Sequence, residues 1–189
     1  MCHSNFPPGT FGGVIVDPPW TFTTRSKKGI TPKGAGGQYS TMTLDDIFAL
    51  PVRDLMADNS IAIVWATFPM LGEALDAIDA WGLDYVSGGA WAKQSKTGAK
   101  WGFGTGYVLR SASEPFLVAR KGRPKIKSRS ARNLIVAPVR EHSRKPEAQL
   151  DLLEAIAEPR YLELFSRQES GRENWVHWGD QLNKFPGHC

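Results

Sequence analysis

Short apolar runs of strand length alternate along this chain with stretches of helical period, and no other feature constrains its fold as strongly. The runs that predict buried strands are residues 14–16, 60–66, 116–118 and 161–165. Helical periodicity occurs twice, at Leu71, Leu75 and Ile78 after Pro69, and at Leu150, Leu153 and Ile156 between Pro146 and Pro159. Thr43, which two acids follow closely, is typical of a helix N-cap. Strands that alternate with helices favour an α/β fold with a mainly parallel sheet.

The length of the chain and its few cysteines exclude several classes of protein. Its 189 residues fit a single domain, residues 1–189, that can fold on a hydrophobic core alone. Cys2 and Cys189 lie at opposite ends without Cys or His neighbours at zinc spacing, which argues against a disulfide framework or a metal site. The longest apolar run, residues 61–68, is far shorter than the ~20 residues that span a bilayer, and residues 1–8 do not resemble a signal peptide. We therefore expect a soluble cytoplasmic protein without membrane contact.

The tetrapeptide Asp17-Pro18-Pro19-Trp20 follows directly on the first predicted strand. Ligands of α/β proteins bind at the carboxyl ends of strands, so these residues lie where a site is expected. The prolines restrict the backbone and supply no N–H group, which leaves nearby carbonyl groups free to face a ligand. Asp17 and the Pro18 carbonyl could each accept a hydrogen bond from a heterocyclic amine while Trp20 stacks on the ring. The structural alternative is a proline-braced turn with a buried tryptophan.

With the motifs that follow it, this tetrapeptide resembles the DPPW branch of the adenine amino-methyltransferases. That branch includes bacterial and phage enzymes and the catalytic subunit of the mRNA adenosine methyltransferase. The resemblance extends from residue 11 to residue 182, and its further motifs are residues 38–43, 65, 90–93, 114, 143–147, 163–167, 174–175 and 178–182. It implies a Rossmann-like fold that uses S-adenosylmethionine, with the catalytic tetrapeptide placed before the main cofactor strand in a permuted order.

The resemblance also implies roles for individual residues. The catalytic set is Asp17, Pro18, Pro19 and Trp20. Lys145 would meet the methionine carboxylate of the cofactor, and the other implied cofactor contacts are Ser143, Glu163, Phe165, Arg167, Asp180 and Gln181. The target adenosine would lie near Tyr39, Trp65, Lys93 and Glu114. Many members of this branch have Asn where this chain has Asp180, and His-Asn where it has Glu169-Ser170.

Basic residues concentrate in one segment, which indicates contact with a polyanion. Seven of the 23 basic residues lie between Arg120 and Arg132 with no acid among them. We expect phosphate contacts beside the catalytic cleft from Lys125, Lys127, Arg129 and Arg132. The alternatives are that this segment is only a solvated loop, or that the nucleic acid follows the second basic stretch, residues 25–33. Residues 102–106, within an unassigned stretch from residue 94 to residue 106, are interpreted as a mobile substrate loop or a flexible linker.

Three functions fit these observations. The first is methyl transfer from S-adenosylmethionine to the exocyclic amine of adenine in DNA, which we expect rather than RNA because the chain is compact and carries no RNA-binding zinc module. The alternatives are an RNA adenosine methyltransferase and a non-catalytic nucleic-acid-binding subunit of the same fold. Residues 17–20 together with Lys145 argue against the last. Sequence specificity must come from loops or an oligomeric partner, and a homodimer is one such arrangement.

Overall fold

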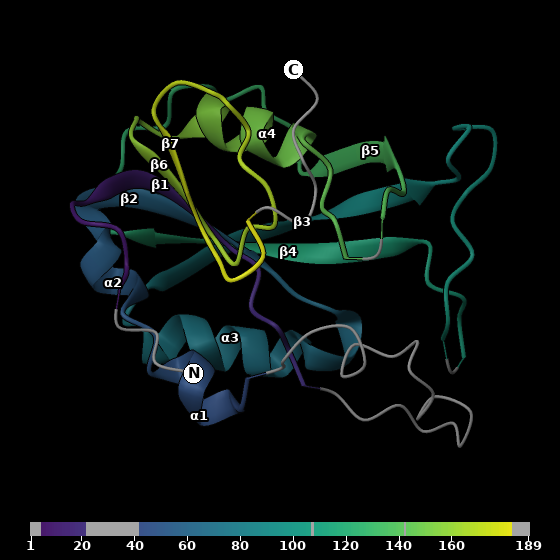
Figure 1. Ribbon diagram of the computed structural model, residues 1–189, viewed down its shortest axis with the longest axis horizontal. Helices are drawn as coiled ribbons and strands as arrows, with labels where there is room; N and C mark the ends of the chain where they lie inside the picture. Colours follow the sequence, from purple (N-terminus) through teal and green to yellow (C-terminus); the bar gives the residue numbers. More distant parts are fainter. Residues whose placement is uncertain (1–4, 22–41, 107, 142, 183–189) are drawn as a thin grey trace.

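The computed structural model describes residues 5–21, 42–106, 108–141 and 143–182, which form one sheet with helices on both faces (Figure 1). The strands are β1 (Phe11–Val16), β2 (Met56–Trp65), β3 (Asp84–Gln94), β4 (Ser113–Lys121), β5 (Leu134–Pro138), β6 (Tyr161–Leu164) and β7 (Trp175–Trp178). The helices are α1 (Leu44–Phe48), α2 (Val52–Leu55), α3 (Leu71–Ala80) and α4 (Ala148–Ile156), and a single 3-10 turn, η3 (Phe68–Met70), precedes α3.

The seven strands are ordered β5-β3-β4-β2-β1-β6-β7. β1 lies at the inner part of the sheet and pairs in parallel with β2 and β6, and β6–β7 and β3–β5 are parallel as well. β4 is antiparallel to both of its neighbours, β2 and β3. The prediction of an α/β fold with a mainly parallel sheet is therefore confirmed, with β4 as the reversed strand.

The reversal of β4 decides which loops meet at each edge of the sheet. We call the edge where β1, β2, β3 and β6 end the carboxyl edge, and the opposite one the amino edge. β4 begins at the carboxyl edge, where Phe116 pairs with Trp65, and ends at the amino edge, where Lys121 pairs with Ser60. The chain that follows Lys121 therefore starts on the far side of the sheet from the end of β1.

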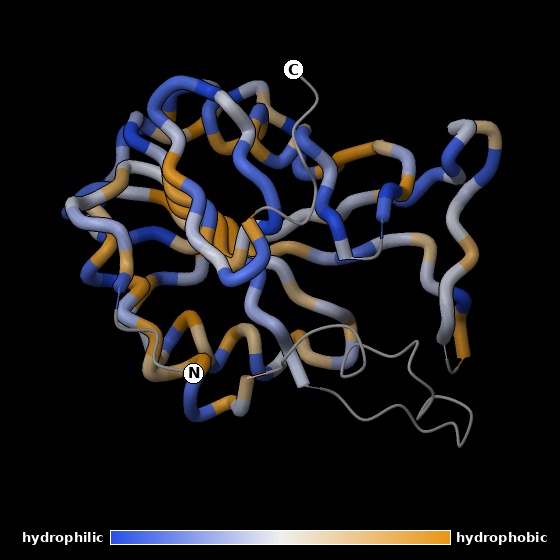
Figure 2. The backbone as a smooth tube through the Cα atoms, viewed as in Figure 1, coloured by the Kyte–Doolittle hydropathy of each residue, from blue (hydrophilic) through white to orange (hydrophobic). Residues whose placement is uncertain are grey.

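Two hydrophobic cores lie on the two faces of the sheet. Alternate residues of β1 face opposite sides, so Val14 packs with α1 and α3 while Ile15 packs with α4. Figure 2 shows the apolar residues gathered along the strands in the middle of the molecule. The buried face of α3 consists of Ala74, Ala77 and Ile78. Leu75, which we expected on that face, is 39% exposed because it lies at the side of this stripe.

The predicted cap of α1 is confirmed, whereas three strands, β3, β5 and β7, were missed. The Thr43 side chain caps α1 by accepting a hydrogen bond from the Asp46 amide at 3.2 Å. β3 was not predicted, because its centre contains Gly88 and Gly89, which are unfavourable in strands. Gly89 has a steric reason: a Cβ atom there would lie 2.3 Å from the Asn133 carbonyl oxygen. None of the helices in the described ranges has the length and apolar composition that a membrane span requires.

Candidate active site

The tetrapeptide turns away from the sheet directly after β1, so that Asp17 lies at the carboxyl edge as predicted. The turn is held by backbone hydrogen bonds: the Trp20 amide donates to the Pro18 carbonyl at 2.8 Å, and the Met42 amide donates to the Pro19 carbonyl at 3.2 Å. The expectation that these carbonyl groups have no internal partner was therefore wrong. Each carbonyl oxygen keeps a second lone pair that a ligand can use.

Trp20 and Trp65, which we expected to contact the substrate, are both buried and pack in the cores beneath the site. Trp20 packs in the core, and its indole N–H donates to the Trp65 carbonyl at 2.9 Å, so its face is not available to stack on a base. Trp65 is fully buried on the other face and donates to Gln149 Oε1 at 2.6 Å. The predicted base stacking by Trp20 and the predicted substrate contact of Trp65 are wrong. Trp65 instead lies below Lys145, whose ammonium nitrogen is 5.3 Å from the ring centre.

Four charged side chains of alternating sign form a chain across the carboxyl edge. Lys145 Nζ contacts both carboxylate oxygens of Asp17, at 3.0 and 2.9 Å, and Glu114 Oε1 at 2.9 Å. The other oxygen of Glu114 pairs with Lys93 Nζ at 2.6 Å. Sequence reasoning named all four residues, and the fold brings them together from β1, β3, β4 and the loop before α4.

The reversed strand β4 explains how Glu114 reaches this chain. Glu114 is the second residue of β4 and therefore lies at the carboxyl edge. It pairs across the β3–β4 ladder with Trp91, which brings Lys93, two residues further along β3, close to the same carboxylate. Lys145 arrives from the loop after β5, where Ser143 adopts a left-handed backbone with φ of 61°.

Burial and the facing charges together set the pKa values of Asp17, Glu114 and Lys145. Lys145 is 8% exposed and Asp17 is 25% exposed. Burial lowers the pKa of Lys145, but the facing Asp17 and Glu114 carboxylates outweigh it and hold that pKa well above its ordinary value. For Glu114, burial is likewise outweighed, here by Lys145 and Lys93, and the pKa lies below its ordinary value.

The pKa of Asp17 moves in the opposite direction. Burial raises it, and the nearby negative charge of Glu114 adds to that effect, while Lys145 opposes both; the net pKa lies above the ordinary aspartate value. An ammonium group has three N–H donors, and the three contacts of Lys145 with Asp17 and Glu114 engage them. A carboxylate ligand that binds Lys145 must therefore replace one of these contacts.

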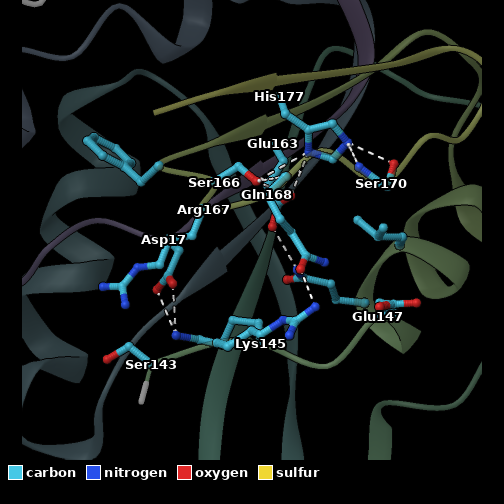
Figure 3. A pocket seen from close by; sticks show the side chains of 14 residues that line it. Asp17, Ser143, Lys145, Glu147, Glu163, Ser166, Arg167, Gln168, Ser170 and His177 are labelled. Atoms are coloured by element: carbon cyan, nitrogen blue, oxygen red, sulfur yellow. Dashed lines mark hydrogen bonds and ion pairs between the residues drawn. The ribbon is translucent and has the colours of Figure 1, made fainter. Parts of the chain in front are cut away.

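A cavity opens beside this chain at the ends of β1 and β6 (Figure 3). Most of the implied cofactor residues line it, namely Ser143, Lys145, Glu163, Phe165 and Arg167, together with Asp17. Figure 3 shows Asp17 and Lys145 on one side of the cavity and a cluster around Glu163 and His177 on the other. The cavity wall carries three cations, Arg144, Lys145 and Arg167, and three carboxylates, Asp17, Glu147 and Glu163. No group of three metal-ligating side chains is found in the described parts of the chain.

Other predicted residues are not part of this cavity. Asp180 and Gln181 follow β7 at the carboxyl edge but are not among the described residues that line the cavity. Tyr39 and the basic stretch at residues 25–33 lie outside the described residues.

The basic segment that begins at Arg120 starts at the amino edge, away from its predicted place beside the catalytic cleft. Lys127 Nζ donates to the Glu154 carbonyl at 2.9 Å and contacts the hydroxyl of Tyr161, the first residue of β6, at 3.4 Å. The predicted place of Lys127 is therefore wrong, because β4 is antiparallel and delivers the start of the segment to the amino edge. The segment then returns to β5, whose first residue, Leu134, pairs with Ala90 in the second half of β3, so the phosphate contacts of Lys125, Arg129 and Arg132 stay a prediction.

Sequence reasoning missed several residues of the cavity wall, which are Arg144, Gln149, Ser166, Gln168, Ser170 and His177. Gln149 is a buried polar residue that joins Trp65 to Glu163, to which its amide donates at 2.8 Å. Arg144 and Ser166 lie within two motifs of the resemblance, residues 143–147 and 163–167, which was the available signal for them. Gln149, Gln168, Ser170 and His177 lie outside the motifs, His177 between residues 174–175 and 178–182.

Comparisons with known proteins identify the family of the chain. The family model for MT-A70 matches residues 11–181. An N(6)-adenosine-methyltransferase MT-A70-like protein of Arabidopsis thaliana is 33% identical over 182 residues, which is 93% of this chain and 24% of that protein. The N6-methyladenosine RNA methyltransferase MTA1 of Pyricularia oryzae is 31% identical over 93% of this chain and 48% of its own length.

The human N(6)-adenosine-methyltransferase catalytic subunit METTL3 is 28% identical over 183 residues, with 93% of this chain and 29% of that protein covered. The chain thus spans between about a quarter and about a half of the length of these relatives. The match covers both the tetrapeptide and the strands that bound the cavity. The chain belongs to the MT-A70 family.

Proposed function

We propose that this chain transfers a methyl group from S-adenosylmethionine to the exocyclic amine of adenosine in RNA. The observation that carries the proposal is the partly exposed Asp17 carboxylate, held by the buried Lys145 at the mouth of a cavity with mixed charges. The relatives whose names state a substrate act on adenosine, and in one case on RNA. Our expectation of a DNA substrate has no support in these names, so RNA becomes the main proposal.

The residues of the cavity fit the chemical groups of this cofactor. Its amino-acid end carries a carboxylate and an ammonium group, for which Lys145, Arg167 and Glu163 supply opposite charges. Ser143 offers a hydroxyl group that can donate to or accept from a sugar. When bound, S-adenosylmethionine would supply an electrophilic methyl group on a sulfonium ion. Lys145 can reach a carboxylate only by giving up one contact with Asp17 or Glu114, which would couple cofactor binding to the release of Asp17 for the base.

Asp17 would act on the adenine amine by orientation and charge. The lone pair of that amine is delocalised into the ring, which makes the nitrogen a weak nucleophile. A hydrogen bond to Asp17, and a second to the free lone pair of the Pro18 carbonyl, would favour a pyramidal nitrogen directed at the methyl carbon. As the nitrogen–carbon bond forms and the sulfur–carbon bond breaks, the nitrogen gains positive charge, which the Asp17 carboxylate stabilises. The methylated nitrogen then loses its proton to water or to Asp17.

The path of the nucleic acid is proposed along the carboxyl edge. Residues 95–112 between β3 and β4, which we call the arm, project from this edge (Figure 1). The exposed basic residues of the arm are Lys96, Lys100 and Arg110, and the arm has no acidic residue. Phosphate contacts made there would lie on the same side of the sheet as Asp17, whereas a contact made by Lys127 would lie at the amino edge.

Transfer of a radiolabelled methyl group from S-adenosylmethionine to single-stranded RNA, single-stranded DNA and duplex DNA, measured in parallel, tests the proposal. We expect incorporation into adenosine-containing RNA and none with Asp17→Asn, which keeps the shape of the side chain and removes its charge. Greater incorporation into either DNA would show that the substrate assignment is wrong. Binding of nucleic acid without incorporation into any of the three would favour the non-catalytic alternative.

A further inference from the structure

A second polar cluster lies on the cavity wall opposite Asp17, and Glu163 is its only member with a role in the proposed function. Its centre is the pair Glu163 and His177, which face each other directly across the parallel β6–β7 ladder. Their side chains are 12% and 5% exposed, respectively. Ser166 and Ser170, from the loop after β6, complete the cluster, and Figure 3 shows all four side chains converging beside the cavity.

The hydrogen bonds of Glu163 leave part of its carboxylate available to a ligand. Oε2 is contacted by His177 Nδ1 at 2.9 Å and by Ser166 Oγ at 2.8 Å. Oε1 accepts from the Gln149 amide at 2.8 Å. A carboxylate oxygen has two lone pairs, so Oε2 is saturated and Oε1 can accept one more hydrogen bond. Because Glu163 lines the cavity, Oε1 is an acceptor suited to a hydroxyl or ammonium group of a bound molecule.

The contacts of His177 determine which ring nitrogen carries the proton. The backbone N–H of Ser170 is directed at Nε2, at 3.2 Å, and the Ser170 hydroxyl lies 2.8 Å from the same atom. A backbone N–H can only donate, so Nε2 must be an unprotonated acceptor. The single proton of the neutral ring is then on Nδ1, where it is donated to Glu163 Oε2.

His177 donates its Nδ1 proton to Glu163 alone, whereas the single hydroxyl proton of Ser166 has two possible acceptors. The Ser166 hydroxyl has one proton but lies 2.8 Å from two acceptors, Glu163 Oε2 and the Gln168 carbonyl. Whenever that proton goes to Gln168, the imidazole N–H is the remaining donor to Oε2. A nearly buried carboxylate that loses such a donor is destabilised in its ionised form.

We propose that His177, as the Nδ1–H tautomer, is a positioning residue that fixes the orientation of the Glu163 carboxylate and so presents Oε1 as an acceptor for a hydroxyl or ammonium group of the cofactor. The proposal rests on the proposed function, since it requires that S-adenosylmethionine occupies this cavity. His177 itself touches Glu163 and the two serines and acts on the ligand through them. Ser170, His177 and Glu163 also have the spacing of a hydrolytic triad, but the Ser170 N–H competes for Nε2, which weakens that nitrogen as a base.

Two replacements of His177 separate the donor from the bulk of the side chain. His177→Asn places an amide N–H near the position of Nδ1, and His177→Leu keeps an apolar side chain but has no donor. Ser170→Ala is the matched control, because it removes the hydroxyl partner of Nε2 and keeps the backbone N–H. Cofactor affinity of each full-length variant would be measured by titration calorimetry with S-adenosylmethionine, and thermal unfolding would verify that each is folded.

We expect His177→Leu to weaken cofactor affinity roughly tenfold or more, the size of a hydrogen bond to a charged group, while His177→Asn and Ser170→Ala stay within about threefold of the parent. Nitrogen-15 NMR of the cofactor-free protein should show a protonated Nδ1 and an unprotonated Nε2. Unchanged affinity in a folded His177→Leu variant, equal losses in His177→Asn and His177→Leu, or a protonated Nε2 would overturn the role of His177. Labelling of Ser170 by a fluorophosphonate probe would likewise overturn it in favour of a hydrolytic site. Failure of the parent chain to bind the cofactor would instead refute the proposed function.

Discussion

Replacing Lys145 with methionine is expected to expose how strongly Asp17 depends on its cation. Methionine keeps the contact with the Trp65 ring but removes the charge that faces Asp17 and Glu114. Glu114 retains Lys93 at 2.6 Å, so the residue left without a facing cation in this chain of charges is Asp17. Removal of one partner of a buried ion pair costs roughly 3–5 kcal/mol, and the partial exposure of Asp17 favours the lower end.

A loss of about 3 kcal/mol in the free energy of unfolding corresponds to a fall in Tm of roughly 6–12 °C for a domain of this size. Thermal and urea unfolding at neutral pH would measure it, and the double variant Asp17→Asn with Lys145→Met should recover most of the loss. The sign of the pH dependence follows from Asp17, whose pKa in the folded variant exceeds that of the unfolded chain. The deficit is then largest at neutral pH and narrows as acid protonates Asp17. A Lys145→Met variant as stable as the parent, or a double variant with no recovery, would refute this reasoning.

Three further predictions concern activity and binding. Asp17→Ala should lower the rate of methyl transfer ~10²–10³-fold with cofactor affinity within a few-fold of the parent, and a variant that keeps a tenth of the parental rate would contradict the role of Asp17. Glu114→Gln removes a charge that raises the pKa of Asp17, so the fall of the single-turnover rate in acid should move to lower pH. If the acid side of the pH–rate profile stayed in place or moved to higher pH, the charge of Glu114 would not control the pKa of Asp17. Changing the arm residues Lys96, Lys100 and Arg110 to Gln should flatten the salt dependence of RNA binding by about two units, at ~0.7 per lost contact. The control change of Arg123 and Lys125 to Gln, between Lys121 and Lys127 at the amino edge, should leave it unchanged. If only the change in the basic segment flattened the salt dependence, the basic segment would be the nucleic-acid site.

The parts of the fold that the sequence predicts are those where burial is continuous. β1 and the second half of β2 are buried at every residue, and their apolar runs are unambiguous. β3 escaped prediction because two glycines at a close approach and the exposed Tyr85 and Val86 interrupt its pattern. Leu75 was misplaced because helical spacing defines a stripe without defining its centre.

The site shows a similar division. Asp17 and Lys145 were predictable from sequence motifs, and Glu114 and Lys93 from the resemblance of this sequence to a known family. All four belong to short segments that occur in a fixed order along the chain. The start of the basic segment was misplaced because a local sequence does not state the direction of the preceding strand. Had β4 been parallel, the chain after Lys121 would have emerged at the carboxyl edge. The roles of Trp20 and Trp65 were wrong because an aromatic side chain looks the same in sequence whether it stacks on a ligand or fills a core.

The identity of the methylated atom tests the central claim most directly. An adenosine-containing RNA would be incubated with the full chain and S-adenosylmethionine, digested to nucleosides and analysed by mass spectrometry against authentic standards. If Asp17 and Lys145 orient the exocyclic amine as we propose, the product is N6-methyladenosine, and it disappears with Asp17→Asn while cofactor binding persists. Methylation at a ring nitrogen or a ribose oxygen, or N6-methyladenosine formed equally well by Asp17→Asn, would contradict the account.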